Sequence, residues 1–554
     1  MSDAPSRLSN ALVSARTVAR LLVKNGLLFN LRPDGVREVA RLARAGISGP
    51  AAAIHLHAAN RPDRIALKGG GRAYTYATLG DRADRLAAGL KASGLGPRDP
   101  ILLMMRNRTE MSELQLAIAL LGGSAVNVSW RSTPAELEYL ALHSDSKAIF
   151  VEADLSPVVD QVRPKLSVEP NRYFVVGGTR DGFVPYDAAF ATTRERMDGG
   201  RHGAVVVYTS GTTGKPKGAV RRFPRAAIRA LMRFVAETPL RTDDRHLVVC
   251  PMYHSTAYAF AGITTTMGGT VVIPDGFDPE GFLRTVEAER ITTSAVVPTM
   301  LHRIMALPAS VRRRYDTSSL RCIFSGGAPL SGELARAFIH DFGPILWNFY
   351  GATETGINTV ATPEELLACP NTIGHIVPGN EIRFLDDKGN EVPRGETGEL
   401  YVRNEMLMAG YHRDEDATRS SMRDGYFSVG DLGHIDSATG LLLLDGRKRD
   451  MVISGGVNVY PAEVEAALSS CPLVDECAVI GVPDPEWGER VRAFVVRKPG
   501  TDPTPAEILA HCKGILAGPK MPRDIVFLDE LPKNPTGKVL KRELRLLGTL
   551  AGGS

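Results

Sequence analysis

The chain of 554 residues has few cysteines, no long apolar run and little net charge. Its six cysteines are scattered without the paired spacing of a metal site, and we interpret them as reduced thiols and core residues. No apolar run reaches about 18 residues, so the sequence predicts no membrane-spanning helix. A net charge of +4 is too small for this length to favour nucleic-acid binding as the main function.

Internal repeats and low-complexity tracts are also missing from the sequence. The first residues lack the compact apolar core and the small-residue cleavage site of a signal peptide, so we expect a cytoplasmic protein. With 44% apolar and 23% charged residues, the composition is that of an ordinary globular protein. The length is too great for one hydrophobic core, which predicts two or three domains.

The first 48 residues differ in character from the rest. They carry eight arginines or lysines against three acidic residues, interleaved with leucine, valine and phenylalanine. This pattern predicts two amphipathic helices around a break at residues 30–35. One interpretation is peripheral contact with an anionic membrane surface. The other is a helical arm that packs on the main domain.

From about residue 49 onward, the sequence alternates between helical and strand patterns. Apolar residues at helical spacing predict helices at residues 75–95 and 111–121, and short apolar runs predict strands at 101–105, 247–250 and 294–297. Such alternation implies an α/β fold whose sheets are mixed but mostly parallel and are flanked by helices. Folds of this class bind ligands in the crevice at the strand ends.

Two later regions depart from this alternation. Residues 374–402 carry short strands and turns, which indicate a small β-barrel-like subdomain. Residues 445–450 form a polar run without periodicity, and we place a domain boundary there. The sequence therefore predicts an N-terminal extension at residues 1–48, a large domain at residues 49–447 and a small α/β domain at residues 448–554.

A stretch rich in glycine, hydroxyl groups and lysine follows the apolar run at residues 204–208. Residues 209–218 hold three glycines, four hydroxyl side chains and two lysines. Glycine lets the backbone approach a ligand closely and lysine adds positive charge, so the stretch suits a polyphosphate. It is not a Walker loop, because Gly211 and Gly214 lie too close together and Lys215 is followed by proline. The alternative interpretation is a flexible surface loop.

Other predicted strand ends carry small or polar residues. Residues 326–329 form a turn flat enough to admit a planar ring. Glu354 lies between two threonines in a glycine-bounded loop, where a carboxylate suits Mg²⁺, although an isolated loop glutamate is usually just solvated. The carboxylate of Asp431 suits a ribose diol. His254, which lies among aromatic residues, either lines an apolar pocket or is an ordinary core histidine.

Taken together, these segments resemble the adenylate-forming superfamily, in its acyl-CoA synthetase or fatty-acid–CoA ligase type. The resemblance covers about residues 50–545. Seven segments carry it in order: 209–218, 326–330, 350–355, 426–431, 446–450, 454–460 and 532–538. It implies the use of ATP, Mg²⁺ and CoA. A carboxylate attacks the α-phosphorus of ATP to give an acyl-adenylate and pyrophosphate, and the CoA thiol then releases AMP.

The resemblance also implies roles for individual residues. The catalytic candidates are Thr353, His254, Glu354 as the Mg²⁺ ligand, and Lys538, which reaches between the carboxylate and the α-phosphate. The nucleotide- and CoA-binding candidates are Thr209, Ser210, Gly211, Thr212, Thr213, Gly214, Lys217, Gly327, Ala328, Pro329, Tyr350, Gly351, Asp431, Arg447, Gly455 and Gly456. Arg449 is the implied hinge, about which the mobile small domain exchanges Lys538 for residues 454–456 at the site.

The resemblance implies an acyl pocket walled by His254, Tyr258, Thr299, Ser325 and Gly326. Residues 252–257 include no acidic side chain that could pair with an ammonium group, so an amino acid is disfavoured as the substrate. The basic N-terminus favours a medium- or long-chain fatty acid, and an aryl acid remains open.

Two other functions remain open. An acyl-AMP ligase that delivers its acyl group to a carrier protein would carry an inserted loop in the large domain, and none is evident. A non-catalytic binding protein would not need the charged residues at Lys217, Glu354, Asp431, Arg447 and Lys538. We therefore predict an AMP-forming CoA ligase whose partners are a small carboxylic acid, ATP and CoA. Nucleic acid is not among the expected partners, and the oligomeric state is left open.

Overall fold

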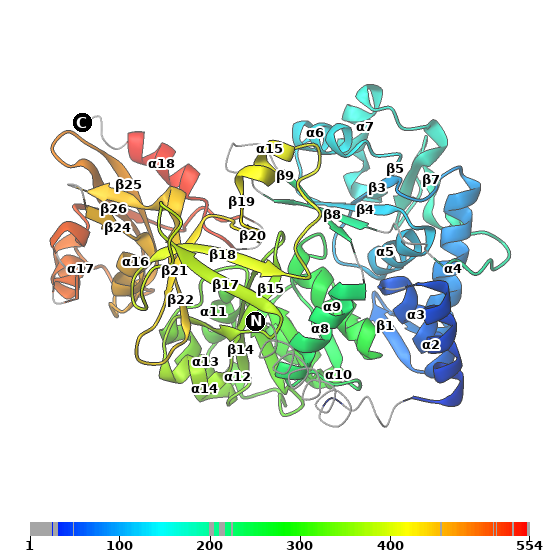
Figure 1. The fold of residues 1–554 in the computed structure, drawn as a ribbon, viewed down its shortest axis with the longest axis horizontal. Helices are drawn as coiled ribbons and strands as arrows, with labels where there is room; N and C mark the ends of the chain where they lie inside the picture. Colours follow the sequence, from blue (N-terminus) through cyan, green and yellow to red (C-terminus); the bar gives the residue numbers. More distant parts are fainter. Residues whose placement is uncertain are drawn as a thin grey trace, which may run out of the picture.

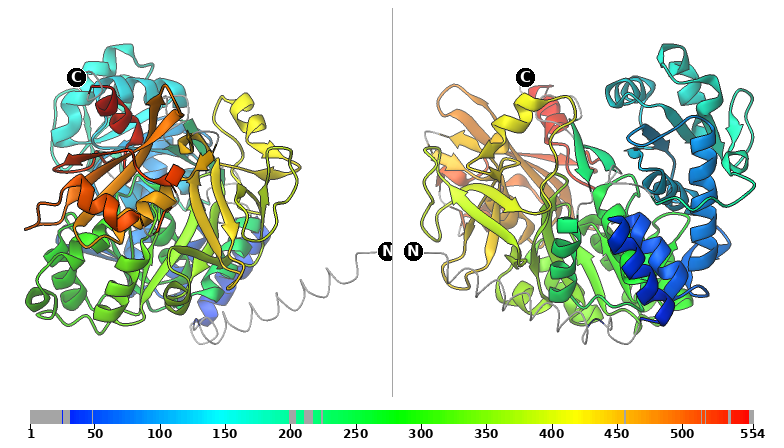
Figure 2. Two further views of the ribbon diagram at one scale, coloured as in Figure 1. Left: turned by 90° about the vertical axis from the view of Figure 1, so that its left-hand side faces the viewer. Right: turned by 45° about the vertical axis from the view of Figure 1, so that its right-hand side comes forward.

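The computed structural model describes Asn25 and residues 31–47, 49–198, 204–209, 217–222, 225–454, 457–513, 515–516, 518–534 and 537–550. These residues form a large sheet-rich domain and a smaller C-terminal domain, drawn in orange and red at one end of the molecule (Figure 1). The two further views show the small domain beside the green and yellow part of the large domain (Figure 2). The expected α/β class is confirmed.

A seven-stranded sheet forms the first half of the large domain. Its strand order is β7 (Val184–Pro185), β6 (Tyr173–Val176), β5 (Ala148–Glu152), β3 (Pro100–Met104), β4 (Ser124–Val128), β8 (Ala204–Thr209) and β9 (Lys217–Arg222). The strands from β7 to β8 pair in parallel, and β9 returns antiparallel to β8. The predicted phosphate stretch therefore begins at the end of β8 and finishes at the start of β9, two strands that pair at the edge of this sheet.

A fifteen-stranded sheet forms the second half. Its parallel part runs from β1 (Ile65–Gly69), with β2 (Arg72–Thr75) at its edge, through β11 (Thr270–Ile273), β10 (Arg245–Val248), β12 (Thr293–Val296) and β13 (Cys322–Ser325) to β14 (Leu346–Ala352). The antiparallel part continues through β15 (Gly356–Ala361), β16 (Thr372–Ile376), β22 (Leu442–Arg447), β21 (Asp431–Ile435), β18 (Gly398–Asn404), β20 (Tyr426–Phe427) and β19 (Met422–Arg423), with β17 (Asn380–Leu385) on β18. The predicted barrel-like subdomain is thus continuous with the parallel sheet.

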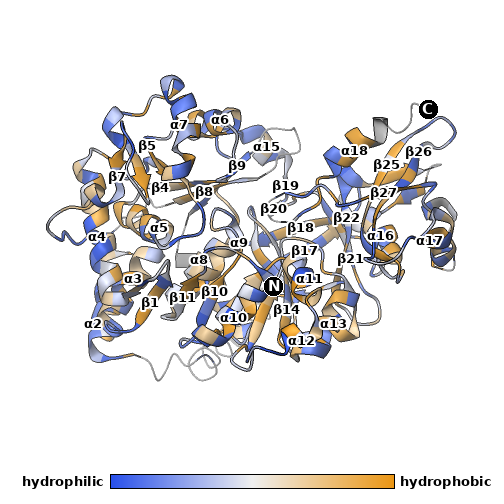
Figure 3. Cartoon of the chain, turned by 180° about the vertical axis from the view of Figure 1, so that it is seen from behind, coloured by the Kyte–Doolittle hydropathy of each residue, from blue (hydrophilic) through white to orange (hydrophobic). Residues whose placement is uncertain are grey.

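Helices cover these sheets and fill the layer between them. In chain order they are α2 (Pro33–Ala45), α3 (Pro50–Asn60), α4 (Tyr76–Ala92), α5 (Thr109–Leu121), α6 (Pro134–Ser144), α7 (Ser156–Val162), α8 (Arg225–Glu237), α9 (Ser255–Met267), α10 (Pro279–Glu289), α11 (Pro298–Met305), α12 (Ala309–Arg312), α13 (Gly332–Phe342), α14 (Pro363–Ala368) and α15 (Glu415–Ser420). Strands are mostly hydrophobic and many helices turn hydrophilic residues outward, as Figure 3 shows.

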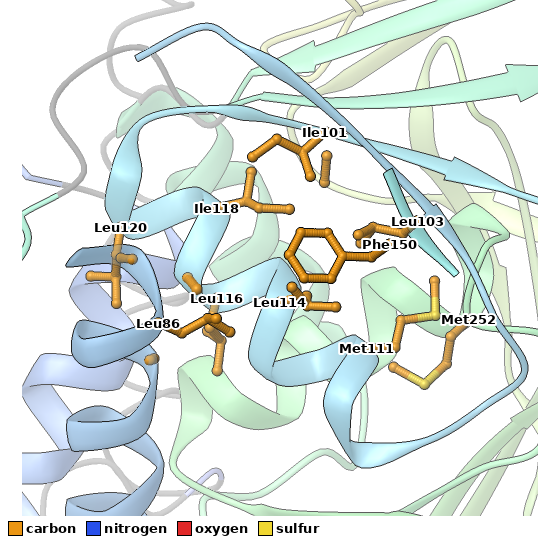
Figure 4. Close-up of a cluster of buried hydrophobic side chains, with 14 of the residues drawn as sticks. Leu86, Ile101, Leu103, Met111, Leu114, Leu116, Ile118, Leu120, Phe150 and Met252 are labelled. Carbon is orange, nitrogen blue, oxygen red and sulfur yellow. The ribbon is translucent and has the colours of Figure 1, made fainter. Parts of the chain in front are cut away.

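Helix α5 illustrates why the core lies between the two sheets. Its sequence is apolar on nearly all sides, and such a helix requires burial all round. Its side chains Met111 and Leu114 lie close to Leu103 of β3, Phe150 of β5 and Met252, which follows β10 (Figure 4). One hydrophobic cluster therefore joins both sheets and fixes their relative position.

The small domain is built on a five-stranded sheet. Its order is β24 (Val457–Val459), β23 (Val452–Ser454), β26 (Gly488–Arg497) and β25 (Val474–Asp484), with β27 (Asp524–Leu528) parallel to β26. Its helices are α16 (Pro461–Ser469), α17 (Pro505–Cys512) and α18 (Lys541–Leu550). The chain enters this domain from β22 through the short 3-10 helix η5 (Lys448–Asp450).

The structure gives the conformation of the polar run and corrects the break expected at residues 30–35. Residues 445–447 of the expected polar run belong to strand β22, where Asp445 accepts hydrogen bonds from Thr397 and contacts His434. Backbone pairing with β21, in which Arg447 lies opposite Asp431 and Gly446 opposite Leu432, gives this polar segment its strand conformation. The break expected at residues 30–35 ends earlier, because α2 begins at Pro33, and proline is well tolerated at the first position of a helix.

Helix α2 packs on the large domain. Leu42 is buried, and the Arg41 guanidinium donates to Asp198 at 3.0 and 3.1 Å. Asn25 is also buried, and its side-chain amide donates to the carbonyl of Val235 at 3.2 Å. These contacts favour the packed-arm interpretation for the described part of the extension. Within the described ranges, no helix is long and apolar enough to cross a membrane.

Candidate active site

The carboxyl ends of β10, β12 and β13 meet at one edge of the parallel sheet. Gly327 follows β13 with φ of 79°, in the left-handed region that favours glycine. A Cβ atom at this position would lie 3.8 Å from Val297, at the end of β12, and 4.0 Å from the hydroxyl of Thr256 in the first turn of α9. The predicted turn at residues 326–329 therefore lies where three strand ends converge, as expected for a ligand crevice.

A hydrogen-bonded set joins three of the predicted nucleotide-binding residues. The Tyr350 hydroxyl donates to Asp431 Oδ2 at 2.7 Å, and Arg447 Nε lies 3.0 Å from Asp431 Oδ1. Asp431 and Arg447 are directly paired across β21 and β22, which brings the two charges together. Asp431 is buried, and its carboxylate is thus held in one orientation by both partners.

Glu354 and Lys217 are linked through Tyr411, a residue that the sequence did not single out. Glu354 is buried in the turn between β14 and β15, and Tyr411 donates to its Oε1 at 3.0 Å. The Lys217 ammonium lies 5.1 Å from the centre of the Tyr411 ring and 4.0 Å from Asp414 Oδ2. One tyrosine therefore contacts both the predicted metal ligand and the lysine of the phosphate hairpin.

The other predicted parts of the phosphate region lie around this pair. The Thr353 hydroxyl is 3.3 Å from that of Ser255, at the start of α9. Thr209 and Lys217 are paired residues at the mouth of the β8–β9 hairpin. Gly351 lies in β14, where a Cβ atom would be 2.0 Å from the carbonyl oxygen of Gly356. Seven predicted residues lie outside the described ranges: Ser210, Gly211, Thr212, Thr213, Gly214, Gly455 and Gly456.

Lys538 reaches this region from the small domain. Burial lowers the pKa of its ammonium group to about 8, and the charge of Arg447 acts in the same direction, while Asp431 opposes it. The preceding residue, Gly537, has φ of 76°, and a Cβ atom there would lie 2.2 Å from the Thr299 hydroxyl. The loop of Lys538 is thus seated between the Asp431–Arg447 pair and the start of α11.

Two of the five predicted acyl-pocket residues, Ser325 and Gly326, lie at the end of β13. Alternation along β13 puts Ser325 on the face of Ile323, toward α11 and Thr299. Gly326 lies against Phe349, whose ring would be 2.4 Å from a Cβ atom, on the face covered by Phe260 of α9. The pocket expected from the sequence would therefore be formed from both sides of this strand end.

His254 lies directly before the first residue of α9. Burial lowers the pKa of its ring to about 4, so the ring is neutral at pH 7. Its Nε2 atom is enclosed without a hydrogen-bond partner in the part of the chain that the structure describes. A ligand atom that donates or accepts a hydrogen bond would satisfy this nitrogen.

The predicted hinge residue, Arg449, lies in η5 between the two sheets. The Lys448 amide donates to the carbonyl of Gly430 at 2.9 Å, and the Met451 amide donates to that of Arg447 at 3.1 Å. Burial lowers the pKa of the Arg449 guanidinium. The location is that of a connection between domains, and rotation about it stays a prediction.

Sequence reasoning missed Arg221, Tyr411, Ser255 and Asp414. A weak signal existed for Arg221, since it follows three small or apolar residues, Gly218 to Val220, in an otherwise regular strand. Tyr411 and Asp414 carry no local signal. Both reach the site through pairing of their segment with β9, including the bridge between Ala219 and Tyr411.

Comparison with known proteins identifies the family of this chain. The family model of the AMP-binding enzyme matches residues 54–412, and that of the AMP-binding enzyme C-terminal domain matches residues 463–538. The chain is 35% identical over 503 residues to an indoleacetate–CoA ligase of Aromatoleum aromaticum, covering 89% of this chain and 97% of the relative. It is 30% identical over 472 residues to a long-chain-fatty-acid–CoA ligase of Mycobacterium tuberculosis, covering 85% and 92%.

The solved structures agree. An anthranilate CoA ligase in complex with anthranoyl-AMP matches with a TM-score of 0.84 and 27% identity, over 92% of this chain and 99% of that one. The expectation drawn from the seven ordered segments is thereby confirmed at the level of the family. The chain belongs to the AMP-binding enzyme family of the adenylate-forming superfamily, and within it to the AMP-forming acyl-CoA synthetase type.

Proposed function

We propose that this enzyme ligates a carboxylic acid without an ammonium group to CoA, through an acyl-adenylate. The proposal rests on the position of the loop that carries Lys538. Its ammonium group lies near Asp431 and Arg447, the residues proposed to hold ribose, and its neighbour Gly537 contacts Thr299 of the proposed acyl wall. A single cation is thus held between the proposed nucleotide and acyl subsites.

In the first half-reaction, a carboxylate oxygen of the acid attacks the α-phosphorus of ATP and the bond to pyrophosphate breaks. Negative charge develops on the α-phosphate and on the departing pyrophosphate, where Lys538 and Lys217 respectively would stabilise it. In the second half-reaction, the CoA thiolate attacks the acyl carbon and the carbon–oxygen bond to AMP breaks. The thiol proton leaves to solvent, and AMP departs with the bonding electron pair.

Glu354 is suited to a magnesium ion shared with ATP. Its carboxylate is buried, and Tyr411 donates to its Oε1 atom. Among the described residues, no group of three or more His, Cys, Asp or Glu is arranged to hold a metal by itself. This composition fits Mg²⁺, which commonly takes one or two carboxylates and completes its shell with phosphate oxygens and water. When bound, the ion would neutralise negative charge on the phosphates, and Glu354 would hold the ion in position.

We propose an aryl or arylalkanoic acid as the first substrate class and a fatty acid as the second. The first turn of α9 carries no acidic residue, so nothing there would pair with a substrate ammonium group. The enclosed Nε2 of His254 favours a tail that offers a polar atom, such as a ring hydroxyl or an indole N–H, over a bare alkyl chain. Relatives named for indoleacetate and anthranilate support this order.

The test is an activity panel with the full-length protein, ATP, Mg²⁺ and CoA. Indole-3-acetate, a hydroxycinnamate, benzoate, octanoate, palmitate and phenylalanine are compared by release of AMP and pyrophosphate and by thioester formation. We expect an aryl acid to give the highest kcat/KM and phenylalanine to give none. Thioester formation with phenylalanine, or AMP release that does not depend on CoA while an added acyl-carrier protein becomes acylated, would refute the proposal.

A further inference from the structure

Arg221 lies on β9, four residues after Lys217, and its side chain turns inward beneath the turn that carries Glu354. Its Nη1 donates to the carbonyl of Thr353 at 2.7 Å, and its Nη2 donates to the carbonyl of Met406 at 2.9 Å. Burial lowers the pKa of this guanidinium, and the charge of Glu354 acts against that effect. A charged group has thus been taken out of water to hold two main-chain carbonyls.

The main chain of β9 is fastened to the same region. The Val220 amide donates to the carbonyl of Gly410 at 3.2 Å, and the His412 amide donates to that of Gly218 at 2.7 Å. Tyr411, between these two bonded residues, donates its hydroxyl to Glu354. Strand β9 therefore approaches Glu354 from two directions: through Tyr411 at the carboxylate and through Arg221 at the preceding peptide.

We propose that Arg221 is a positioning residue that holds the carboxylate of Glu354 at a fixed separation from the phosphate hairpin. The proposal rests on the role of Glu354 as the Mg²⁺ ligand given above. The planar fork of arginine supplies two donors in one rigid group, which lysine cannot reproduce. A metal held by both a protein carboxylate and a bound triphosphate requires a fixed distance between the two. Arg221 lies on β9, the strand after the phosphate loop, and donates a hydrogen bond to the turn that carries Glu354.

The test measures metal binding directly, with Mn²⁺ as the probe and a non-hydrolysable ATP analogue present. Free and bound Mn²⁺ are distinguished by electron paramagnetic resonance. We expect Arg221→Gln to weaken Mn²⁺ binding about tenfold, as is usual when a group that orients a metal ligand is removed. The adenylation rate should recover in part at high Mg²⁺, and the KM for the acid should stay unchanged. A parent-like Mn²⁺ affinity in a folded Arg221→Gln protein would overturn the proposal.

Three further proteins make the result specific. Arg229→Gln is the matched control, since Arg229 is exposed and pairs with Glu405 beside Met406; it should bind Mn²⁺ like the parent. Arg221→Lys keeps the charge without the planar guanidinium and should weaken Mn²⁺ binding about threefold. It serves as the test if Arg221→Gln fails to fold. Glu354→Gln identifies the source of a negative result. If Glu354→Gln and Arg221→Gln both bind Mn²⁺ like the parent, the assignment of Glu354 as the metal ligand fails. If Glu354→Gln loses Mn²⁺ while Arg221→Gln binds it like the parent, only the role of Arg221 is refuted.

Discussion

The ammonium group of Lys538 lies among Arg447, Arg449, Asp431 and Asp450, in surroundings that lower its pKa to about 8. Removal from water is the main cause, since a charged amine loses hydration there. Most lysines stay protonated well above neutral pH, whereas this one would lose its proton under mildly alkaline conditions. The charge of the group proposed to stabilise the α-phosphate is therefore sensitive to pH in the mildly alkaline range.

We expect kcat/KM for adenylation to fall as the pH rises through about 8, because kcat/KM reports the free enzyme and the deprotonated amine carries no charge. Bound ATP adds negative charge, which favours the ammonium form and moves the corresponding limb of kcat to higher pH. The measurement is a pH profile of ATP–pyrophosphate exchange. In Lys538→Arg the limb should disappear, because a guanidinium stays protonated; a limb that persists would assign the titration to another group.

Replacing Lys538 by alanine should separate the two half-reactions. We expect the adenylation rate to fall by about 100-fold or more, because a preorganised charge at the α-phosphate is lost. Thioester formation from supplied acyl-AMP and CoA should continue at close to the parent rate. Single-turnover assays of each half-reaction make the comparison, and an equal loss in both would contradict the role given to this lysine.

The site is tightly packed around Gly326. Because a Cβ atom would lie 2.4 Å from the Phe349 ring, Gly326→Ala should lower the free energy of unfolding by about 1–3 kcal/mol. Thermal or urea unfolding gives the value. The double variant with Phe349→Leu should cost less than the sum of the two single changes, since the smaller side chain relieves the overlap. Additive costs would indicate that the backbone moves instead.

At the scale of elements, periodic segments are predictable and polar connections are not. The helix expected at residues 75–95 is α4, and the strand expected at 101–105 is β3, because each pattern is long or strongly apolar. The polar residues at the end of β22 are strand because β22 pairs with β21, and this pairing has no signal in the local sequence. Arg221 bonds to a carbonyl 132 residues away, so the weak signal in its local sequence could not reveal its role. The site residues could be predicted from the family resemblance, whereas the residues that position them are recognised only from tertiary contacts.

The connection η5 carries the prediction that belongs to this scale. Proline locks φ near −65° and restricts the residue before it, so Arg449→Pro should trap one arrangement of the two domains. We expect acyl-AMP to form at a substantial fraction of the parent rate, while formation of acyl-CoA falls by orders of magnitude. Rapid-quench analysis of both products provides the measurement.

Thermal melting is the control for this variant, because a proline that unfolds the small domain would abolish both steps. A well-folded Arg449→Pro protein that converts acyl-AMP and CoA at the parent rate would show that the rotation does not occur at η5.

At the scale of the whole molecule, the N-terminal extension is bound to the large domain at two described places, Asn25 and α2. Deleting residues 1–47 removes the buried Leu42 and the Arg41–Asp198 pair, so we expect a loss of about 2 kcal/mol or more in unfolding free energy. Deleting residues 1–24 retains both contacts and should leave stability and turnover of water-soluble acids nearly unchanged.

The shorter deletion also tests the expected membrane contact. Residues 1–24 hold Arg7, Arg16, Arg20 and Lys24 against one acidic residue, Asp3, so their removal should reduce binding to vesicles containing anionic lipid. Co-sedimentation at low and physiological salt provides the measurement. Unchanged sedimentation would leave the packed arm as the better account of the extension.

The close approach of Gly537 to Thr299 bears on the lifetime of the reactive intermediate. A mixed anhydride formed beneath this loop would be shielded from bulk water for as long as the loop stays seated, because the Thr299 side chain leaves no space for a methyl group on Gly537. Leakage of free acid and AMP would then be timed by withdrawal of the small domain and not by the intrinsic rate of hydrolysis. The methyl group of Gly537→Ala would keep the loop from closing fully. The amount of ATP converted to AMP per thioester formed would then rise.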